Sequence, residues 1–126
     1  MSETISIPAD KMVQYRRTAQ KRWRAEQEQR RQRRARAWEL AQQAAALLKA
    51  DFDVERVVLF GSLLNPDRFT LHSDVDLAAW GLTPQNWLKA IAAVSLLADD
   101  IPLNLVDAAT CSPELLAVIE REGMRL

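Results

Sequence analysis

The segment from Arg56 to Trp80 restricts the fold of this chain more than any other segment. Residues 57–60 form a short apolar run with two valines that ends at a glycine, which is the pattern of a buried β-strand. Gly61 permits a tight turn, and Ser62 can cap a short helix whose free backbone N–H groups favour an anion. The segment therefore begins with a predicted strand and a predicted phosphate-binding turn.

Two aspartates stand close together near the end of the same segment. Asp74 and Asp76 alternate with Val75 and Leu77, so an extended strand places both carboxylates on one face and both apolar side chains on the other. Neighbouring carboxylates repel unless a cation lies between them, and sites with only oxygen ligands suit Mg²⁺ or Mn²⁺. A phosphate-binding turn beside a divalent metal indicates nucleotidyl transfer. The simpler alternative is two aspartates on the solvated side of an edge strand.

These motifs together carry a family resemblance. Phe60-Gly61-Ser62, followed after a polar loop by Ser73-Asp74-Val75-Asp76-Leu77, closely resembles the signature of the DNA polymerase beta-type nucleotidyltransferases, in particular the minimal nucleotidyltransferases. The resemblance covers about residues 52–126 and implies an α/β fold with a small mixed sheet and flanking helices. It also implies a site in which Asp74 and Asp76 are catalytic and bind the metal, and in which the nucleotide is bound by Gly61, Ser62 and Ser73.

The resemblance also implies a partner and a reaction. Small proteins of this family are commonly antitoxins encoded beside a HEPN-domain ribonuclease toxin, and they can adenylylate a tyrosine of that toxin with ATP and Mg²⁺. We therefore expect a HEPN-domain toxin as partner in a hetero-oligomer, ATP as substrate, Mg²⁺ or Mn²⁺ as cofactor, and a tyrosine hydroxyl as acceptor of AMP.

The sequence departs from the family pattern in the predicted third strand, residues 103–107. The resemblance implies a third carboxylate that binds metal and helps to deprotonate the acceptor, but the matching residue is Asn104. An asparagine can offer a carbonyl oxygen to a metal and cannot act as a base. Asp107 lies three residues further, so a strand without a bulge points it to the opposite face. Weakened catalysis is expected, and the alternative is a protein that neutralises its partner by binding alone.

The charges divide the chain into two parts. The net charge is zero, but residues 1–50 hold 12 Lys/Arg and 5 Asp/Glu, whereas residues 51–126 hold 5 and 12. We expect residues 1–50 to be a long basic helix that serves as a partner-binding arm, and residues 51–126 to be the nucleotidyltransferase domain.

The basic part has the pattern of one helix. No Gly or Pro occurs from Ala9 to Phe60, and about forty helical residues span roughly 60 Å, more than a small domain is wide. Two apolar stripes occur at helical spacing, and the second is expected to pack on the sheet. The first consists of Met12, Tyr15, Ala19 and Trp23, and the second of Trp38, Ala41, Ala45 and Leu48.

The stretch between the stripes, Arg24 to Arg36, contains six arginines and allows three interpretations. The first is a solvated helix with Glu–Arg pairs. The second is a docking surface for an acidic protein or a second copy, since the distal stripe needs a cover. The third and least favoured is nucleic-acid binding. Arg68 and His72 border the predicted site, and each is more simply a solvated loop residue.

The remaining signals concern the other helices and the compartment. Thr83-Pro84 predicts a helix through Leu97 with a buried face of Trp87, Leu88, Ile91, Val94 and Leu97, and Ser112-Pro113 begins a last helix that Gly123 ends. The single cysteine excludes an internal disulfide, the N-terminus lacks the pattern of a signal peptide, and no apolar run approaches the ~18 residues of a membrane span. We therefore expect a cytoplasmic protein with no membrane association.

Overall fold

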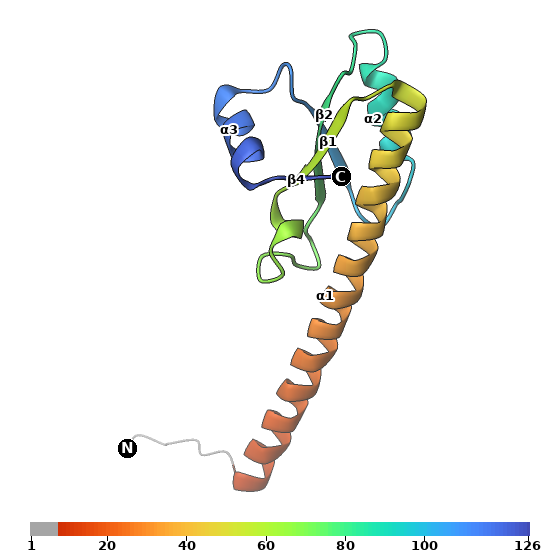
Figure 1. Cartoon of the computed structure of the whole chain (residues 1–126). Coiled ribbons are helices and arrows are strands. Elements are labelled where there is room, and N and C mark those ends of the chain that lie inside the picture. The colour runs from red at the N-terminus through yellow and green to blue at the C-terminus, as the bar shows by residue number, and fades with distance from the viewer. Residues whose placement is uncertain (1–7) are drawn as a thin grey trace, which may run out of the picture.

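The computed structural model describes residues 8–126 and shows a mixed sheet with flanking helices and one long helix (Figure 1). The strand order is β3-β2-β1-β4, with β1 antiparallel to both of its neighbours and β2 parallel to β3. This is the fold class that the sequence predicts. The elements are α1 (Ala9–Phe52), β1 (Arg56–Phe60), the 3-10 helix η1 (Ser62–Leu64), β2 (Val75–Trp80), α2 (Trp87–Ser95), β3 (Leu103–Asp107), α3 (Pro113–Glu122) and β4 (Met124–Arg125).

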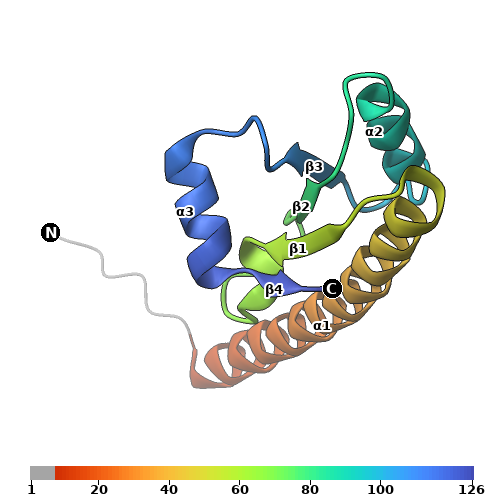
Figure 2. The ribbon, with the colours of Figure 1, turned by 45° about the horizontal axis from the view of Figure 1, so that its top comes forward.

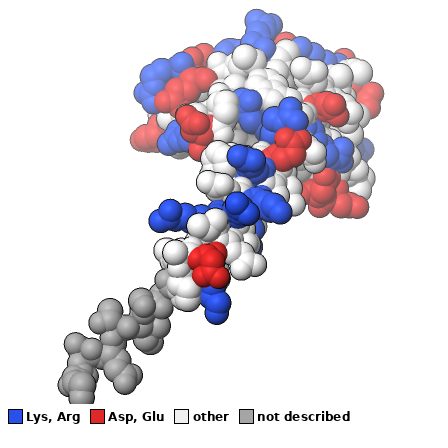
Figure 3. All heavy atoms as spheres, turned by 90° about the horizontal axis from the view of Figure 1, so that it is seen from below, with Lys and Arg blue, Asp and Glu red and all other residues white. Residues whose placement is uncertain are grey.

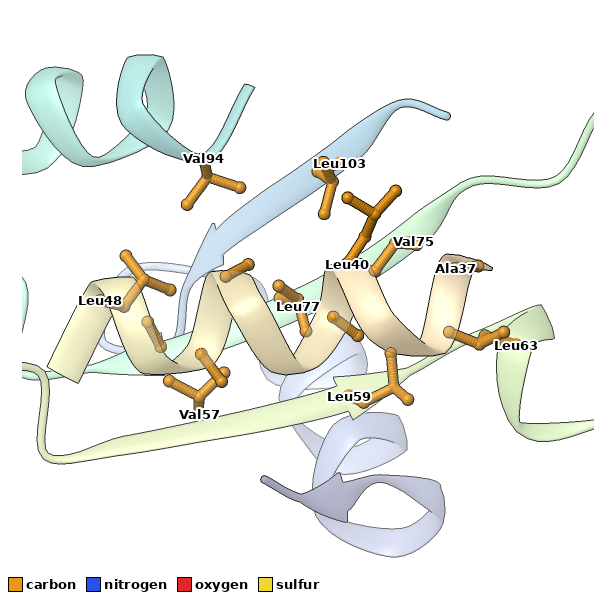
Figure 4. Packing of buried hydrophobic residues seen from close by; sticks show 14 of the residues in the cluster. Ala37, Leu40, Leu48, Val57, Leu59, Leu63, Val75, Leu77, Val94 and Leu103 are labelled. Carbon is orange, nitrogen blue, oxygen red and sulfur yellow. The ribbon is translucent and has the colours of Figure 1, made fainter. Parts of the chain in front are cut away.

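Helices cover both faces of the sheet (Figure 2). Alternate strand residues such as Val57, Leu59 and Leu77 pack with α1 and α2 in the larger apolar cluster (Figure 4). The residues between them, including Val58 and Ala78, pack with α3 in a smaller cluster. The period-2 pattern of the strands therefore builds two cores on opposite faces.

The second half of α1 belongs to the larger core. One side of this half is buried, and it consists mainly of alanines, whose small side chains let the helix lie close to the sheet; the buried residues are Ala37, Leu40, Ala41, Ala44, Ala45 and Leu48. Packing of the second apolar stripe on the sheet is confirmed. The helix ends at Phe52, two residues after the predicted end, and Asp53 closes it in the left-handed conformation with φ 52°. The first half projects away from the domain (Figure 1).

The prediction for α2 is partly wrong. Thr83 and Asn86 cap one another, since Thr83 N donates to Asn86 Oδ1 at 2.8 Å and Asn86 N donates to Thr83 Oγ1 at 3.3 Å. This reciprocal pair forms a separate turn, and the α-helix begins only at Trp87 and ends at Ser95. Leu88 is 76% exposed instead of buried, because the side of this short helix that faces α1 and β3 is formed by Ala90 and Val94.

The last helix begins and ends where the sequence predicts. Ser112 Oγ accepts from Leu115 N at 3.2 Å, and Gly123 is the C-cap. Gly123 has an ordinary φ of −73°, so it does not supply the left-handed turn typical of C-cap glycines. A side chain is excluded there for a different reason: a Cβ would overlap Val58 Cγ1 and the carbonyl of Ile119.

Candidate functional site

The predicted site residues meet at the edge of the sheet where β1 ends and where β2 and β3 begin. Phe60 lies opposite Asp76 in the antiparallel pair, and Asp76 lies beside Asn104 in the parallel pair. The turn at Gly61 follows Phe60 directly, and Asp74 stands two residues before Asp76 on the same side of the strand. Strand register therefore brings three separate segments of the sequence to one place.

The amide of Asn104 joins the two carboxylates. Its Nδ2 donates to Asp74 Oδ2 at 3.2 Å and to Asp76 Oδ1 at 3.1 Å. Both aspartates are half-buried and Asn104 is exposed, so the site is open to solvent on one side. A neutral donor thus bonds to one oxygen of each carboxylate. The predicted placement of both carboxylates on one face is confirmed.

The Gly-Ser turn presses against one of these carboxylates. Gly61 has φ 86°, and a Cβ built on it would lie 2.5 Å from Asp76 Oδ2. Both the backbone conformation and the close approach therefore require glycine. Ser62 is the first residue of η1 and not its cap, which corrects the predicted capping role. The first backbone hydrogen bonds of η1 are donated by Leu64 N and Asn65 N. The N–H groups of Ser62 and Leu63 come earlier in the chain and therefore have no partner within η1.

The loop before β2 is shaped by its own side chains. Ser73 Oγ accepts from Thr70 N at 2.8 Å, so this hydroxyl stabilises the loop that leads into Asp74. Arg68 and His72 lie on the same loop and are exposed. The binding of nucleotide by Ser73 stays a prediction, since this contact gives its hydroxyl a structural role as well.

Asp107 lies on the other face of the sheet, as predicted. The pairing of β2 with β3 runs without interruption from Val75 and Leu103 to Ala79 and Asp107, so no bulge turns this side chain toward Asn104. Asp107 Oδ1 instead accepts from Ala109 N at 3.0 Å in the turn after the strand.

The donor set of the site fits Mg²⁺. In residues 8–126 no three His, Cys, Asp or Glu side chains form a metal-binding group. Mg²⁺ is commonly held by one or two carboxylates and completed by water and phosphate oxygens. Rotation of the Asn104 amide would turn its oxygen toward Asp74 and Asp76, and the three residues would then offer oxygen ligands only.

Four arginines of α1 bind the loops around the site, which the sequence interpretation missed. Arg30 donates to the Phe69 carbonyl through Nε at 3.2 Å and Nη2 at 3.0 Å. Arg34 donates to the Leu63 carbonyl in the same manner at 3.2 and 2.9 Å. These paired contacts fix the middle of η1 and the middle of the following loop to α1.

The other two arginines bind further along the loops. Arg33 donates through Nη2 to the Ser73 carbonyl at 2.9 Å and through Nη1 to the Asp100 carbonyl at 3.1 Å. Arg36 forms a bidentate pair with the Asp100 carboxylate, and its hydrogen bond to this exposed carboxyl holds the pKa of Asp100 below its usual value of 3.8. The segments that precede β2 and β3 are therefore held from the same helix.

This result changes the interpretation of the arginine-rich stretch. The structure describes all of residues 24–36, and one Glu–Arg ion pair forms within them. It joins Arg31 Nη2 to Glu28 Oε1 at 2.7 Å. Arg30, Arg33 and Arg34 lie one or two turns before the buried Ala37 on the same side of the helix. This alignment is visible in the sequence and could have predicted the contacts, because arginines on the same side as the buried stripe face the domain.

Comparisons with known proteins agree with this geometry. No family model matches the sequence, and no curated protein matches it. Among solved structures, a chain of the toxin-antitoxin MntA-HepT crystal structure is 18% identical, with a TM-score of 0.53 over 70% of this chain and 69% of that chain. A chain of the toxin-antitoxin crystal structure with AMP-PNP is 20% identical, with a TM-score of 0.56 over 68% and 70%. The chain has the same fold as these two chains, which is a nucleotidyltransferase fold. At these identities the likeness is one of fold, and at that level the predicted resemblance is confirmed.

The nucleotidyltransferase fold places five of the six predicted site residues at one edge of the sheet; they are Gly61, Ser62, Asp74, Asp76 and Asn104. The sixth, Ser73, immediately precedes Asp74 in the chain. In residues 8–126 no helix has the length and apolar character needed to cross a membrane.

Proposed function

We propose that this chain is a nucleotidyltransferase-type antitoxin. It binds a HEPN-domain ribonuclease toxin and transfers AMP from ATP to a tyrosine hydroxyl of that toxin in a metal-dependent reaction. The observation that carries the proposal is the meeting of the Asp74 and Asp76 carboxylates with the Gly61 turn at one edge of this fold. The likeness to toxin-antitoxin structures, one of them with AMP-PNP, supports both the partner and the nucleotide.

The residues have distinct tasks in this proposal. The backbone of Gly61 and Ser62 seats the phosphates, since the N–H group of Ser62 has no partner within η1. Asp74 and Asp76 hold Mg²⁺ or Mn²⁺ with the carbonyl oxygen of Asn104 as a third ligand. When bound, the ion neutralises charge on the transferred phosphate. Ser73 positions the loop and contacts the nucleotide.

The transfer itself is a displacement at phosphorus. The tyrosine oxygen bonds to the α-phosphorus of ATP, the bond from that phosphorus to the bridging oxygen of the β-phosphate breaks, and pyrophosphate leaves. Asn104 stands where the resemblance implies a carboxylate, and an amide does not accept the hydroxyl proton. The proton therefore passes to water, and transfer is slower than with a carboxylate base at this position.

The partner-binding arm in this proposal is the long basic helix, and the first part of α1 projects from the domain. We assign partner binding to residues 1–50 and nucleotidyl transfer to residues 51–126. The second half of α1 also completes the hydrophobic core of the catalytic part through Ala37 to Leu48. Because the second half of α1 packs in this core, the helix is fixed on the domain.

A second function is favoured by one specific observation. The Asn104 amide donates a hydrogen bond to each of the two aspartates, so both carboxylates have a partner within the protein. A protein with such a site can keep its fold and bind its partner while transferring no AMP. The alternative is therefore a catalytically weakened nucleotidyltransferase that neutralises its partner by contact.

The experiment that separates these functions is an intact-mass measurement. The HEPN-domain protein encoded beside this chain is incubated with the purified chain, ATP and Mg²⁺. A gain of one or more AMP units that is lost with Asp74→Asn/Asp76→Asn establishes the transferase. An unchanged mass in a sample where the two proteins form a complex establishes the alternative, and Asn104→Asp then tests whether this residue is the reason.

A further inference from the structure

Within the partner-binding arm, the projecting part of α1 comprises residues 9–29 and carries an uncovered apolar stripe. Met12, Tyr15 and Trp23 are 37%, 62% and 62% exposed, and Ala19 lies between them. Large aromatic side chains in one row are typical of surfaces that bind another protein. The direction in which the stripe faces decides where such a partner lies.

The stripe faces the same way as the buried side of α1. Eighteen residues make about five turns of an α-helix, so Ala19 lies in line with Ala37, and Trp23 lies in line with Ala41. Ala37 and Ala41 are fully buried against the sheet. The stripe therefore continues the face that supports the domain, past the point where the domain ends. A protein bound to the stripe lies directly beneath the loop of residues 65–73.

The corner between arm and loop is hollow. A cavity of about 300 Å³ lies where α1 leaves the domain, lined mainly by Arg30, Arg31, Arg34, Trp38, Pro66 and Phe69. Phe69 and Arg30 meet there through the Phe69 carbonyl, so the loop is fixed to the helix on this side. The corner thus offers an aromatic and cationic recess next to the apolar stripe.

The basic side chains beside the stripe favour an acidic partner at this corner. From the helical repeat, Arg16 and Arg22 lie about 60° to either side of the stripe, whereas Asp10 and Glu28 lie on the opposite side of the helix. Glu26 is the one acidic residue of the projecting part in line with the stripe, and Arg22 and Arg30 flank it at helical spacing. Lys and Arg side chains also gather where the helix leaves the domain (Figure 3). Two copies that met arm to arm would bring the same positive charges against each other, which disfavours self-association of this kind.

We propose that the corner between the arm and the loop of residues 65–73 is the docking site for the acceptor protein. Its occupant is an acidic protein surface with exposed apolar side chains, and this rests on the proposed function because the occupant is the molecule that receives AMP. Arg33 holds the Ser73 carbonyl, and Asp74 follows directly. Docking therefore places the acceptor beside the edge of the sheet that carries the site.

The test compares charge changes on the two sides of the arm. Arg16→Glu/Arg22→Glu alters the stripe side, and Arg17→Glu/Lys21→Glu makes the same change of charge on the opposite side. Trp23→Ala tests the stripe itself. All five residues are exposed, and thermal unfolding checks that each variant is folded. Binding to the adjacently encoded HEPN-domain protein is measured by calorimetry.

The stripe-side pair and Trp23→Ala are each expected to raise the Kd by about tenfold or more. The opposite pair is expected to raise it by less than about threefold, the size of a long-range charge effect. If AMP transfer occurs, the stripe variants raise the KM for the acceptor and leave the KM for ATP unchanged.

Two results overturn this proposal and leave the proposed function intact. One is an equal effect, or no effect, of the two charge pairs on a complex that does form. The other is a dimer of the isolated chain that Trp23→Ala dissociates in sedimentation, which assigns the stripe to a second copy. If the unaltered chain does not bind the HEPN-domain protein at all, the proposed function fails first and this proposal falls with it.

Discussion

Replacement of Asn104 by aspartate tests how the two carboxylates are held. Asn104→Asp removes two hydrogen bonds, of 3.2 and 3.1 Å, and places a third negative charge beside Asp74 and Asp76. In this open site each lost bond costs about 0.5–1 kcal/mol, and each new repulsion costs about 1 kcal/mol at 4 Å in water. We therefore expect a loss of about 3 kcal/mol in the free energy of unfolding without divalent ions, or a fall in Tm of about 10 °C.

A divalent ion should reverse this loss in the variant alone. Three carboxylates bind Mg²⁺ better than two carboxylates and an amide, and an ion present at a hundred times its Kd stabilises the folded state by about 2.7 kcal/mol. The assay is thermal unfolding in EDTA and in a Mg²⁺ titration. The unaltered chain should gain much less at the same Mg²⁺ concentrations, because metal binding there requires the amide to give up both hydrogen bonds.

Asn104→Ala is the matched control, since it removes the same bonds and adds no charge. It should lose about 1–2 kcal/mol and should gain little from Mg²⁺. High salt should reduce the loss in Asn104→Asp and leave Asn104→Ala unaffected, because only the first contains added repulsion. The explanation is refuted if Asn104→Asp melts with the unaltered chain in EDTA, or if Mg²⁺ stabilises both proteins equally.

Further predictions concern the turn, the arginines and the reaction. Gly61→Ala should lower the free energy of unfolding by about 1–3 kcal/mol in chemical denaturation, and should weaken ATP binding in calorimetry, because its Cβ meets Asp76 Oδ2 at a positive φ. Arg34→Gln should speed amide hydrogen exchange in η1 and the loop after it, since both hydrogen bonds to the Leu63 carbonyl of η1 are lost. Arg36→Gln should lower the Tm at neutral pH. That difference should vanish as the pH falls below 3.8, because a carboxyl whose pKa is lowered in the folded state, here Asp100, loses its contribution when it is protonated. Where AMP transfer to tyrosine occurs, its rate should rise about tenfold per unit between pH 7 and 9 when followed by mass spectrometry, because the acceptor has a pKa near 10 and no carboxylate base; a flat profile would contradict this.

The sheet edge could be predicted from the sequence because its signals are local. A run of valines that ends at Gly61, and two aspartates with period 2, specify strand, turn and face without knowledge of distant contacts. Asn104 could be assigned to the site because the family resemblance implies a third carboxylate at its position, and its pairing with Asp76 comes from the sheet register. The donation of its amide to both carboxylates depends on side-chain positions in three dimensions, which no spacing in the sequence specifies.

The roles of the arginines could not be predicted from composition. Arg30 and Arg34 satisfy loop carbonyls 39 and 29 residues away in the chain, so the partner of each is determined by the tertiary fold. The prediction that Leu88 is buried was wrong for a related reason. Helical spacing shows which residues share a face, but not which face of a short helix packs on the core. In both cases the sequence shows which residues share a face of the helix, but it does not show which part of the folded protein that face contacts.

The arginine contacts connect the arm with the site in a way that bears on both proposed functions. The helix that carries the uncovered stripe also holds the Leu63 and Ser73 carbonyls, which lie at the two ends of the loop between the Gly-Ser turn and Asp74. A partner that binds the arm therefore binds an element to which the site loop is already fixed, so docking needs no rearrangement of the loop to bring an acceptor near. The same rigidity serves a contact antitoxin equally well. The arm can thus be retained by either function, and only the chemistry at Asn104 separates them.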